Sequence, residues 1–292
     1  MLDKVVVCGV GLIGGSFALA QKSALAVRRI VGIGRTPQPL IQARELGVID
    51  EIAIDWASAL QGADLVLLGM PVGQMPAVMQ SLVAHLEPQT VVTDGGSTKS
   101  DVVAAARVAF GDKIAQFVPG HPIAGAEKSG VVAATAELYR DKRVVLTPLP
   151  ENAPAAITRV RTAWEQCGAK VSELTAEDHD RVFAAVSHLP HLLAFALVHD
   201  FAQRKNSDQL FGFAAGGFRD FTRIASSHPE MWRDICVANR TALIAELDAY
   251  QGELMRTRVL LAGADATGLE QMFSAARDRR DAWLESLQPV GE

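Results

Sequence analysis

Residues 5–16 read VVVCGVGLIGGS, an apolar run that leads directly into three spaced glycines. The run is short and continuously apolar, which is typical of a parallel strand buried on both faces. The glycines follow it in the pattern G-x-G-x-x-G, and the next residues have helical spacing. In that context they allow a tight turn, the approach of a pyrophosphate to bare backbone, and close packing of the helix on the strand. The stretch therefore predicts a dinucleotide-binding turn formed by Gly9, Gly11, Leu12, Ile13 and Gly14.

The alternation of a short apolar run with a helical stretch continues far beyond this turn. We expect strands at Lys4–Cys8, Arg29–Ile33, Leu65–Met70, Thr90–Thr93, Ala115–Pro119, Arg143–Leu146 and Lys170–Leu174. Repeated strand–helix units predict a parallel sheet with helices on both faces. After residue 174 only long helical patterns follow. The expected fold class is α/β: a Rossmann-type, doubly wound, mainly parallel domain over residues 1–174, followed by an all-α domain over residues 175–292.

Three short sequences in the second part resemble capping boxes, in which Ser or Thr precedes a helix and an acidic residue follows three positions later. They are Thr175–Asp178, Ser227–Glu230 and Thr267–Glu270. Each predicts the start of a helix.

Composition narrows the functional class. The chain has 292 residues, of which 49% are hydrophobic and 21% charged, as in ordinary globular proteins. Its net charge of −5 argues against a broad nucleic-acid surface. We find no apolar run near the ~20 residues that span a bilayer, and no signal-peptide pattern. We therefore expect a cytoplasmic enzyme or binding protein with no nucleic-acid or membrane partner.

The end of the second expected strand bears on the choice of dinucleotide. NAD-specific sites usually place an acidic residue there, where it binds the ribose 2′-hydroxyl. Here the sequence is Gly34-Arg35-Thr36. A guanidinium suits a 2′-phosphate, and the Thr36 hydroxyl adds a donor. We therefore predict NADP rather than NAD; the alternative is that Arg35 is a solvated residue beside the adenine.

Ligands of such sheets bind at the carboxyl ends of the strands, so the residues there are candidates for chemistry. Pro71 follows one strand end and is a candidate cofactor contact. His121 follows another, in a loop between Gly120 and Pro122, where a neutral imidazole can act as general base on a hydroxyl. Ser97 follows Gly95-Gly96 and can hydrogen-bond substrate and His121 together. A structural turn histidine and a helix N-cap serine are the alternatives.

Five motifs together resemble the prephenate/arogenate dehydrogenase family, also called cyclohexadienyl dehydrogenases. They are GVGLIGGS at 9–16, DGGSTK at 94–99, GHPIAGAEKSG at 120–130, SHLPH at 187–191 and GGFRDFTRIASSHPEMW at 216–232. The resemblance covers nearly the whole chain. It implies oxidative decarboxylation of prephenate to 4-hydroxyphenylpyruvate, or of arogenate to tyrosine, with hydride transfer to a nicotinamide cofactor in tyrosine biosynthesis.

The resemblance also implies roles for single residues. His121 matches the catalytic histidine, and Ser97 the serine beside it. The residues expected to bind or line the substrate site are Arg223, His179, His188, Glu127 and Arg219. Ala126 departs from relatives that have a hydroxyl residue there. On a straight helix His179 and His188 fall on opposite faces, and no acidic residue has a matching spacing, so we expect no metal. His191 is expected to pack or to hydrogen-bond within its helix.

The resemblance further implies a homodimer formed through the helical domain. The apolar residues that suit such an interface are Leu243, Leu247, Leu254, Val259, Leu260 and Leu261. Burial of these residues within one chain is the alternative.

Two other functions remain open at this point. β-Hydroxyacid dehydrogenases also join a Rossmann domain to a helical one, but they use a lysine from a K-x-x-x-N motif that we do not find near the start of the helical domain. A dinucleotide-sensing protein without turnover would not need His121, Ser97 and Arg223 together.

Overall fold

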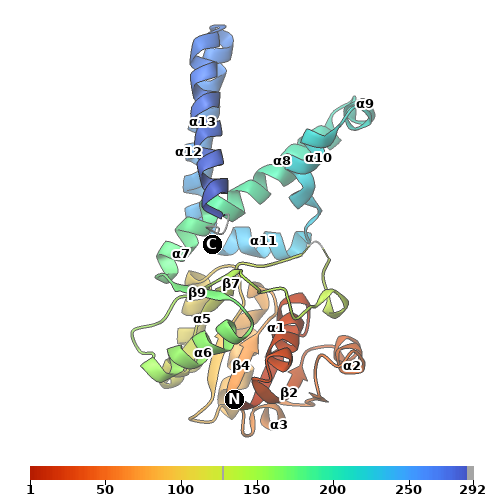
Figure 1. Ribbon diagram of the computed structural model, residues 1–292, viewed down its shortest axis with the longest axis vertical. Helices are drawn as coiled ribbons and strands as arrows, with labels where there is room; N and C mark the ends of the chain where they lie inside the picture. The colour runs from red at the N-terminus through yellow and green to blue at the C-terminus, as the bar shows by residue number, and fades with distance from the viewer. Residues whose placement is uncertain (127, 288–292) are drawn as a thin grey trace. The chain divides into compact units, whose positions relative to one another are not determined.

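The computed structural model describes residues 1–126 and 128–287 and divides into two compact units (Figure 1). The first unit spans Met1–Leu243 and contains every strand found among the described residues. The second begins at Ile244. The predicted domain boundary at residue 174 lies within the first unit and remains a prediction.

A six-stranded parallel sheet forms the base of the first unit, in the order β3-β2-β1-β4-β5-β6. The strands are β1 (Leu2–Cys8), β2 (Val27–Ile33), β3 (Glu51–Ile52), β4 (Leu65–Leu68), β5 (Val91–Asp94) and β6 (Phe117–Val118). Strand order reverses on either side of β1, as in doubly wound folds, and the ligand site of such folds lies at that reversal. The fold class is therefore confirmed. Every strand of this sheet except β3 was predicted. β3 was missed because it is too short to show a hydrophobic pattern.

Helices cover both faces of this sheet (Figure 1). They are α1 (Leu12–Ser23), α2 (Pro37–Glu45), α3 (Trp56–Leu60), α4 (Met75–Leu82), α5 (Ser100–Phe110) and α6 (Pro154–Gln166), with single turns η1 (Val72–Gln74), η2 (Val83–His85), η3 (Gly111–Gln116) and η4 (Val131–Ala133). On one face, Phe17 of α1 packs edge-on against Trp164 of α6, with ring centroids 4.8 Å apart. The other face buries residues of α3, α4 and α5, so the sheet is inaccessible on both sides.

A second, three-stranded sheet follows, made of β7 (Gly120–Pro122), β8 (Arg143–Leu146) and β9 (Lys170–Glu173). β8 pairs with β9 in parallel and with β7 antiparallel. The sequence predicts His121 in a loop, and this is wrong. His121 lies opposite Val145 in β7, because the backbone of Gly120–Pro122 pairs with the apolar strand β8.

The rest of the first unit is helical. Its elements are α7 (Ala176–Phe183), the π-helical turn η5 (Ala184–His188), α8 (Leu189–Gln203), α9 (Ser207–Gly212), α10 (Gly216–Thr222), η6 (Arg223–Ser226), α11 (Pro229–Ala238) and the first residues of α12 (Arg240–Ala262). By length and composition alone, the continuous helix Ala176–Gln203 could cross a membrane. No run of this kind was expected from the sequence. Its first turns carry polar side chains that bond within the unit, as described below.

Of the three predicted capping boxes, one is confirmed. Thr175 caps α7 by accepting a hydrogen bond from the backbone N–H of Asp178. Ser227 does not cap α11, which begins one residue later with Pro229 at its first position. The last helix, α13 (Ala266–Leu287), starts before Thr267, and Asp265 accepts from the N–H of Gly268 instead.

The second unit contains most of α12 and all of α13. The two helices contact each other through Thr257, whose hydroxyl lies 3.6 Å from the Met272 sulfur. Neither helix has a buried residue in this unit, and several large apolar side chains are at least half exposed. These include Leu254, Met255, Val259, Leu261, Phe273 and Trp283.

Candidate active site

The turn between β1 and α1 has the geometry that its glycines predict. Gly9 adopts a positive φ of 87°, and a Cβ there would meet the backbone of Met70 at 2.9 Å. A Cβ on Gly14 would lie 2.4 Å from the Gly9 carbonyl oxygen. Gly11 is different, because a Cβ there would meet nothing within 4 Å. Gly11 therefore faces open space at the N-terminus of α1, where no side chain caps the free N–H groups.

Three segments converge beside this turn. A Cβ on Gly95, after β5, would lie 3.0 Å from Ile13 of the turn and 3.6 Å from Pro122 of β7. A single side chain at Gly95 would therefore contact both the dinucleotide turn and β7, the strand that carries His121. Ser97 lies in this loop, partly exposed. It is not the N-cap of α5, since that position belongs to Lys99.

A buried ion pair between Asp94 and Lys99 fixes this region. Both side chains are fully buried. The Lys99 ammonium also donates to the Gly120 carbonyl, at 2.9 Å, while Asp94 accepts from the N–H groups of Gly96, at 2.8 Å, and Gly120, at 3.0 Å. Both backbone groups of Gly120 are therefore held, which sets the position of the adjacent His121.

His121 belongs to a chain of three polar side chains. Its Nδ1 lies 2.8 Å from Nε2 of His179, and Nδ1 of His179 lies 2.9 Å from a carboxylate oxygen of Asp180. The same carboxylate accepts the N–H groups of Lys99 and Ser100, each at 2.8 Å, and so caps α5 from a distant helix. Both ring nitrogens of His179 are occupied, which leaves it no polar atom for a substrate.

The surroundings keep these histidines neutral near pH 7. Burial lowers the pKa of His121 well below the ordinary histidine range, and the neighbouring His179, Lys99 and His188 act in the same direction, although the residue as a whole is partly exposed. Burial also lowers the pKa of His179. Burial opposes ionisation of Asp180, but the hydrogen bonds from His179, Ser100 and Lys99 hold its pKa below the usual value. The carboxylate is thus ionised beside two neutral rings.

His188 lies on the same side of the helix as Asp180. The Asn239 amide donates to the Asp180 carbonyl oxygen at 2.7 Å and lies 3.1 Å from Nδ1 of His188. A straight helix would place His179 and His188 on opposite faces, and the π turn between them changes that register. Burial lowers the pKa of His188 to about 4. Its Nε2 is buried, and a hydrogen bond between the ring and the Ser97 backbone partly offsets the effect of burial on the pKa.

The two arginines predicted to bind the substrate lie in the helical part of the first unit. Arg223 starts η6 and is close enough to His191 for its charge to help lower the pKa of that histidine, after burial. The His191 ring stacks on Trp232, with centroids 3.6 Å apart. Arg219 is exposed on α10 and faces its neighbour Asp220 at 3.4 Å. Glu127 lies outside the described residues.

The residues predicted to meet the adenosine half of the cofactor follow β2. Gly34, Arg35 and Thr36 are all exposed. Thr36 is the N-cap residue of α2, but its hydroxyl makes no cap hydrogen bond there. Pro71 is exposed after β4, at the start of η1.

Sequence reasoning missed four residues that hold the site together: Asp94, Lys99, Asp180 and Asn239. Asp94 and Lys99 were visible at the two ends of the DGGSTK motif. Asp180 was visible only as the neighbour of His179, and its partners Lys99 and Ser100 lie about 80 positions away. Asn239 carried no signal.

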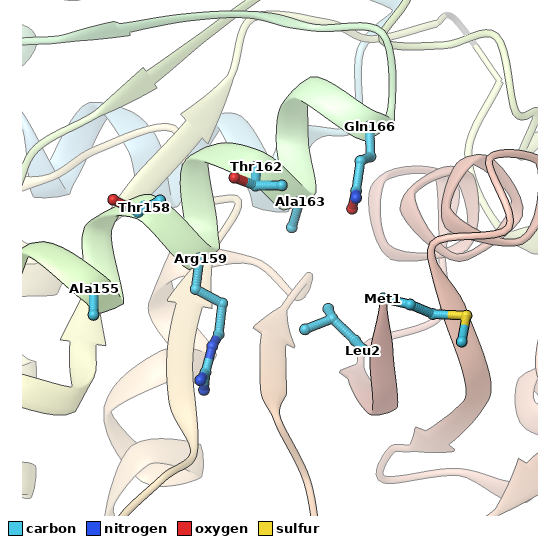
Figure 2. Close-up of a pocket in the computed structure, with 8 residues that line it drawn as sticks. All are labelled: Met1, Leu2, Ala155, Thr158, Arg159, Thr162, Ala163 and Gln166. Atoms are coloured by element: carbon cyan, nitrogen blue, oxygen red, sulfur yellow. The ribbon is translucent and has the colours of Figure 1, made fainter.

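A hollow of about 360 Å³ lies at the opposite end of the sheet and contains none of the predicted site residues (Figure 2). It is lined by the start of β1 and one side of α6 (Figure 2). Its one charged lining residue, Arg159, donates to the carbonyl oxygens of Asp64 and Gln89. Within the described ranges, no group of three or more His, Cys, Asp or Glu side chains is placed to hold a metal ion.

Comparison with known proteins identifies the family. Residues 17–173 match the family model described as prephenate dehydrogenase, nucleotide-binding domain. Residues 175–275 match prephenate dehydrogenase, dimerization domain.

Individual relatives agree with these matches. The chain is 39% identical to a prephenate dehydrogenase of Bacillus subtilis, over 96% of this chain and 76% of that protein. It is 34% identical to a cyclohexadienyl dehydrogenase of Zymomonas mobilis, over 96% of each. The crystal structure of prephenate dehydrogenase from Aquifex aeolicus, in complex with hydroxyphenyl propionate and NAD+, superposes with a TM-score of 0.90 at 35% identity, covering 97% of this chain and 99% of that one. The glycine turn, the buried histidines at the sheet edge and these matches agree: the chain belongs to the prephenate dehydrogenase family.

Proposed function

We propose that this protein catalyses the oxidative decarboxylation of prephenate, with hydride transfer to a nicotinamide dinucleotide, in tyrosine biosynthesis. One observation carries the assignment to this site. Nδ1 of His121 bonds to His179, and its Nε2 has no partner within the described part of the chain. The next residue of its strand, Pro122, lies one side chain away from the dinucleotide turn. A neutral base beside a nicotinamide site suits the oxidation of a hydroxyl group. The relatives named as prephenate dehydrogenases supply the substrate class.

The residues of the turn fit a dinucleotide. The open space at Gly11 and the uncapped N-terminus of α1 offer room and N–H donors for a pyrophosphate. The exposed Pro71 and the loop of Ser97 would border the nicotinamide half. A nicotinamide bound there would supply the hydride acceptor for C4 of the substrate ring.

His121 then performs the proton transfer. Its Nε2 accepts the proton of the ring hydroxyl as C4 loses its hydride and the C–O bond becomes a carbonyl. The bond to the ring carboxylate breaks and carbon dioxide leaves, and its electron pair makes the ring aromatic. The proton held on His121 returns to the phenolate oxygen. Because aromatisation drives the step, the main task of the protein is alignment of C4 and stabilisation of the reacting oxygen.

Other residues would bind the substrate. His188 would line the substrate pocket while it supports the loop of Ser97, because Asn239 donates to its Nδ1 and the ring hydrogen-bonds the Ser97 backbone. Ser97 is placed to contact the hydroxyl and the cofactor side. Arg223 is our proposal for the residue that binds the ring carboxylate, with Arg219 and Glu127 at the mouth of the site. His179 was predicted to line the pocket, and its occupied nitrogens favour a supporting role.

We further propose that the cofactor is NADP. The support is the absence of a carboxylate at Gly34 and the exposed guanidinium of Arg35 beside it. A Cβ on Gly34 would meet only Leu40, at 3.8 Å, so a larger residue fits there without strain. The Aquifex aeolicus structure contains NAD+, which makes cofactor choice a property to be measured for this chain.

The protein would act as a homodimer. The matched dimerization domain and the exposed apolar residues of α12 and α13 support this proposal. Leu254, Val259 and Leu261 are at least half exposed. Leu243 is buried within the first unit, so we no longer include it in the expected interface. Sedimentation equilibrium of the full chain should give twice the monomer mass of 31.2 kDa.

The direct test of the reaction is product identification. Incubation with prephenate and NADP+ should yield 4-hydroxyphenylpyruvate, carbon dioxide and reduced cofactor in equal amounts. Parallel kinetics with arogenate, and with NAD+, rank the substrates and cofactors. Cofactor reduction with a hydroxy acid but not with prephenate or arogenate would instead support a β-hydroxyacid dehydrogenase, and no turnover with any of them would support a sensing protein.

A further inference from the structure

The direction of each hydrogen bond in the His121–His179–Asp180 chain follows from its last member. An ionised carboxylate can only accept, so Nδ1 of His179 carries the proton that it donates to Asp180. Nε2 of neutral His179 is then an acceptor. Nδ1 of His121 must therefore donate to it across 2.8 Å, and the lone pair of neutral His121 lies on Nε2.

We propose that Asp180 and His179 are positioning residues of the reaction: they fix His121 in the tautomer whose Nε2 is a base, and they stabilise the imidazolium that forms when Nε2 takes the substrate proton. This rests on the proposed function, in which His121 is that base. The chain orients His121 without receiving its proton, as a carboxylate orients the histidine of a catalytic triad.

The surrounding contacts prevent the chain from adopting the opposite arrangement. His179 is fully buried, and its ring lies 4.5 Å from that of Phe183, which also flanks His121 at 5.1 Å. If the ring of His179 turned over, Asp180 would lose its Nδ1 donor.

Asp180 itself is fixed at three points. Two backbone N–H groups at the start of α5 hold its carboxylate, and Asn239 holds its carbonyl oxygen. The carboxylate oxygens therefore cannot rotate away from His179.

The charges around the chain favour a neutral His121 before reaction. The groups that face it are His179 on α7, Lys99 at the start of α5 and His188 in the π turn, with Asp94 and Asp180 closer to His179. Lys99 and Asp94 form an ion pair, which leaves Asp180 as the unpaired negative charge nearest to the two rings. This charge acts when the imidazolium forms.

The proposal is tested through His179, because Asp180 also caps α5 and its replacement would disturb that helix. His179→Phe keeps an aromatic ring but removes both hydrogen bonds. We expect kcat to fall about tenfold to 100-fold, a part of the contribution of general base catalysis, while KM changes less than about threefold. His179→Gln, whose side-chain oxygen can accept from His121, should recover a large part of that loss.

A double-mutant cycle separates this role from a purely structural one. In a His121→Asn background there is no base to position, so His179→Phe should lower the remaining kcat by less than about twofold. The same factor in both backgrounds, or a nearly unchanged kcat in His179→Phe, would overturn the proposal. The cycle also identifies which idea has failed. Near-normal activity of His121→Asn would show that His121 is not the base. An inactive His121→Asn together with a fully active His179→Phe would show that His121 is the base but that His179 and Asp180 do not position it.

Nitrogen-15 NMR of labelled histidine provides a readout that needs no disruptive variant. In the wild-type protein at pH 7, the His121 signals, assigned by their loss in His121→Asn, should show a protonated Nδ1 and an unprotonated Nε2. The opposite tautomer would contradict the proposal even if the kinetics agreed.

Discussion

Replacement of Lys99 by Met should destabilise the protein far more than the same change at an exposed ion pair. Lys99→Met removes the ammonium from a fully buried pair and leaves the Asp94 carboxylate without its counter-charge. Breaking a buried pair in this way costs about 3–5 kcal/mol in free energy of unfolding. Asp94 keeps two N–H donors, from Gly96 and Gly120, so we expect a value near the lower limit, about 3 kcal/mol.

Lys22→Met is the matched control. The Lys22 ammonium also bonds one carboxylate, that of Asp50, and one carbonyl, that of Gly47, but its side chain is 28% exposed. Such a pair contributes about 0.2–1 kcal/mol. Urea unfolding followed by tryptophan fluorescence measures both changes, since Trp164 is fully buried in the same unit. The double variant Asp94→Asn/Lys99→Met should be more stable than Lys99→Met alone, because no charge is left unpaired. If Lys99→Met and Lys22→Met lowered the free energy of unfolding equally, within about 0.5 kcal/mol, the buried pair would stabilise the protein no more than the exposed one, contrary to this prediction.

Three further predictions concern the reaction. Arg223→Ala should raise KM for prephenate about tenfold or more by removing the partner of the ring carboxylate, and an unchanged KM in steady-state kinetics would assign that carboxylate to another residue. Because burial lowers the pKa of His121, the base stays unprotonated as pH falls through ~6.5, so a pH profile of kcat/KM should remain level there and decline only at lower pH; an apparent pKa at or above ~6.5 would contradict this. Wild-type protein should prefer NADP to NAD about tenfold or more in kcat/KM. Gly34→Asp should reverse that preference and Arg35→Ala should weaken NADP alone; equal losses of both cofactors in Arg35→Ala would mean that the guanidinium contacts the adenine instead.

The parts of the fold that sequence could predict are those with a repeated local signal. Strands such as β1 and β4 are continuous apolar runs, and the glycine turn has a fixed spacing, so both were predicted in place. β3 and β7 have two and three residues, too few for a pattern, and they form because longer neighbouring strands pair with them. This is why His121 was expected in a loop.

In the site, too, the residues that lie in local motifs were predictable, and the long-range contacts between them were not. His121, Ser97 and His188 lie in motifs that sequence alone singles out. The interactions that hold them were not predictable, because Asp180 reaches Lys99 across about 80 residues and Asn239 reaches His188 across 51. The π turn between His179 and His188 also escaped prediction, since local sequence does not distinguish it from a regular helix. Its effect is to change the register of His188 relative to His179, and His179 helps to lower the pKa of His188.

We propose that His121 is the base of this reaction. The initial rate of reduced-cofactor formation at 340 nm, with saturating prephenate, tests this role. His121→Asn keeps a hydrogen-bonding side chain in β7 but cannot take up a proton at neutral pH. We expect kcat to fall at least about 100-fold while KM changes less than about threefold. A kcat close to that of the wild-type protein at neutral pH would contradict it.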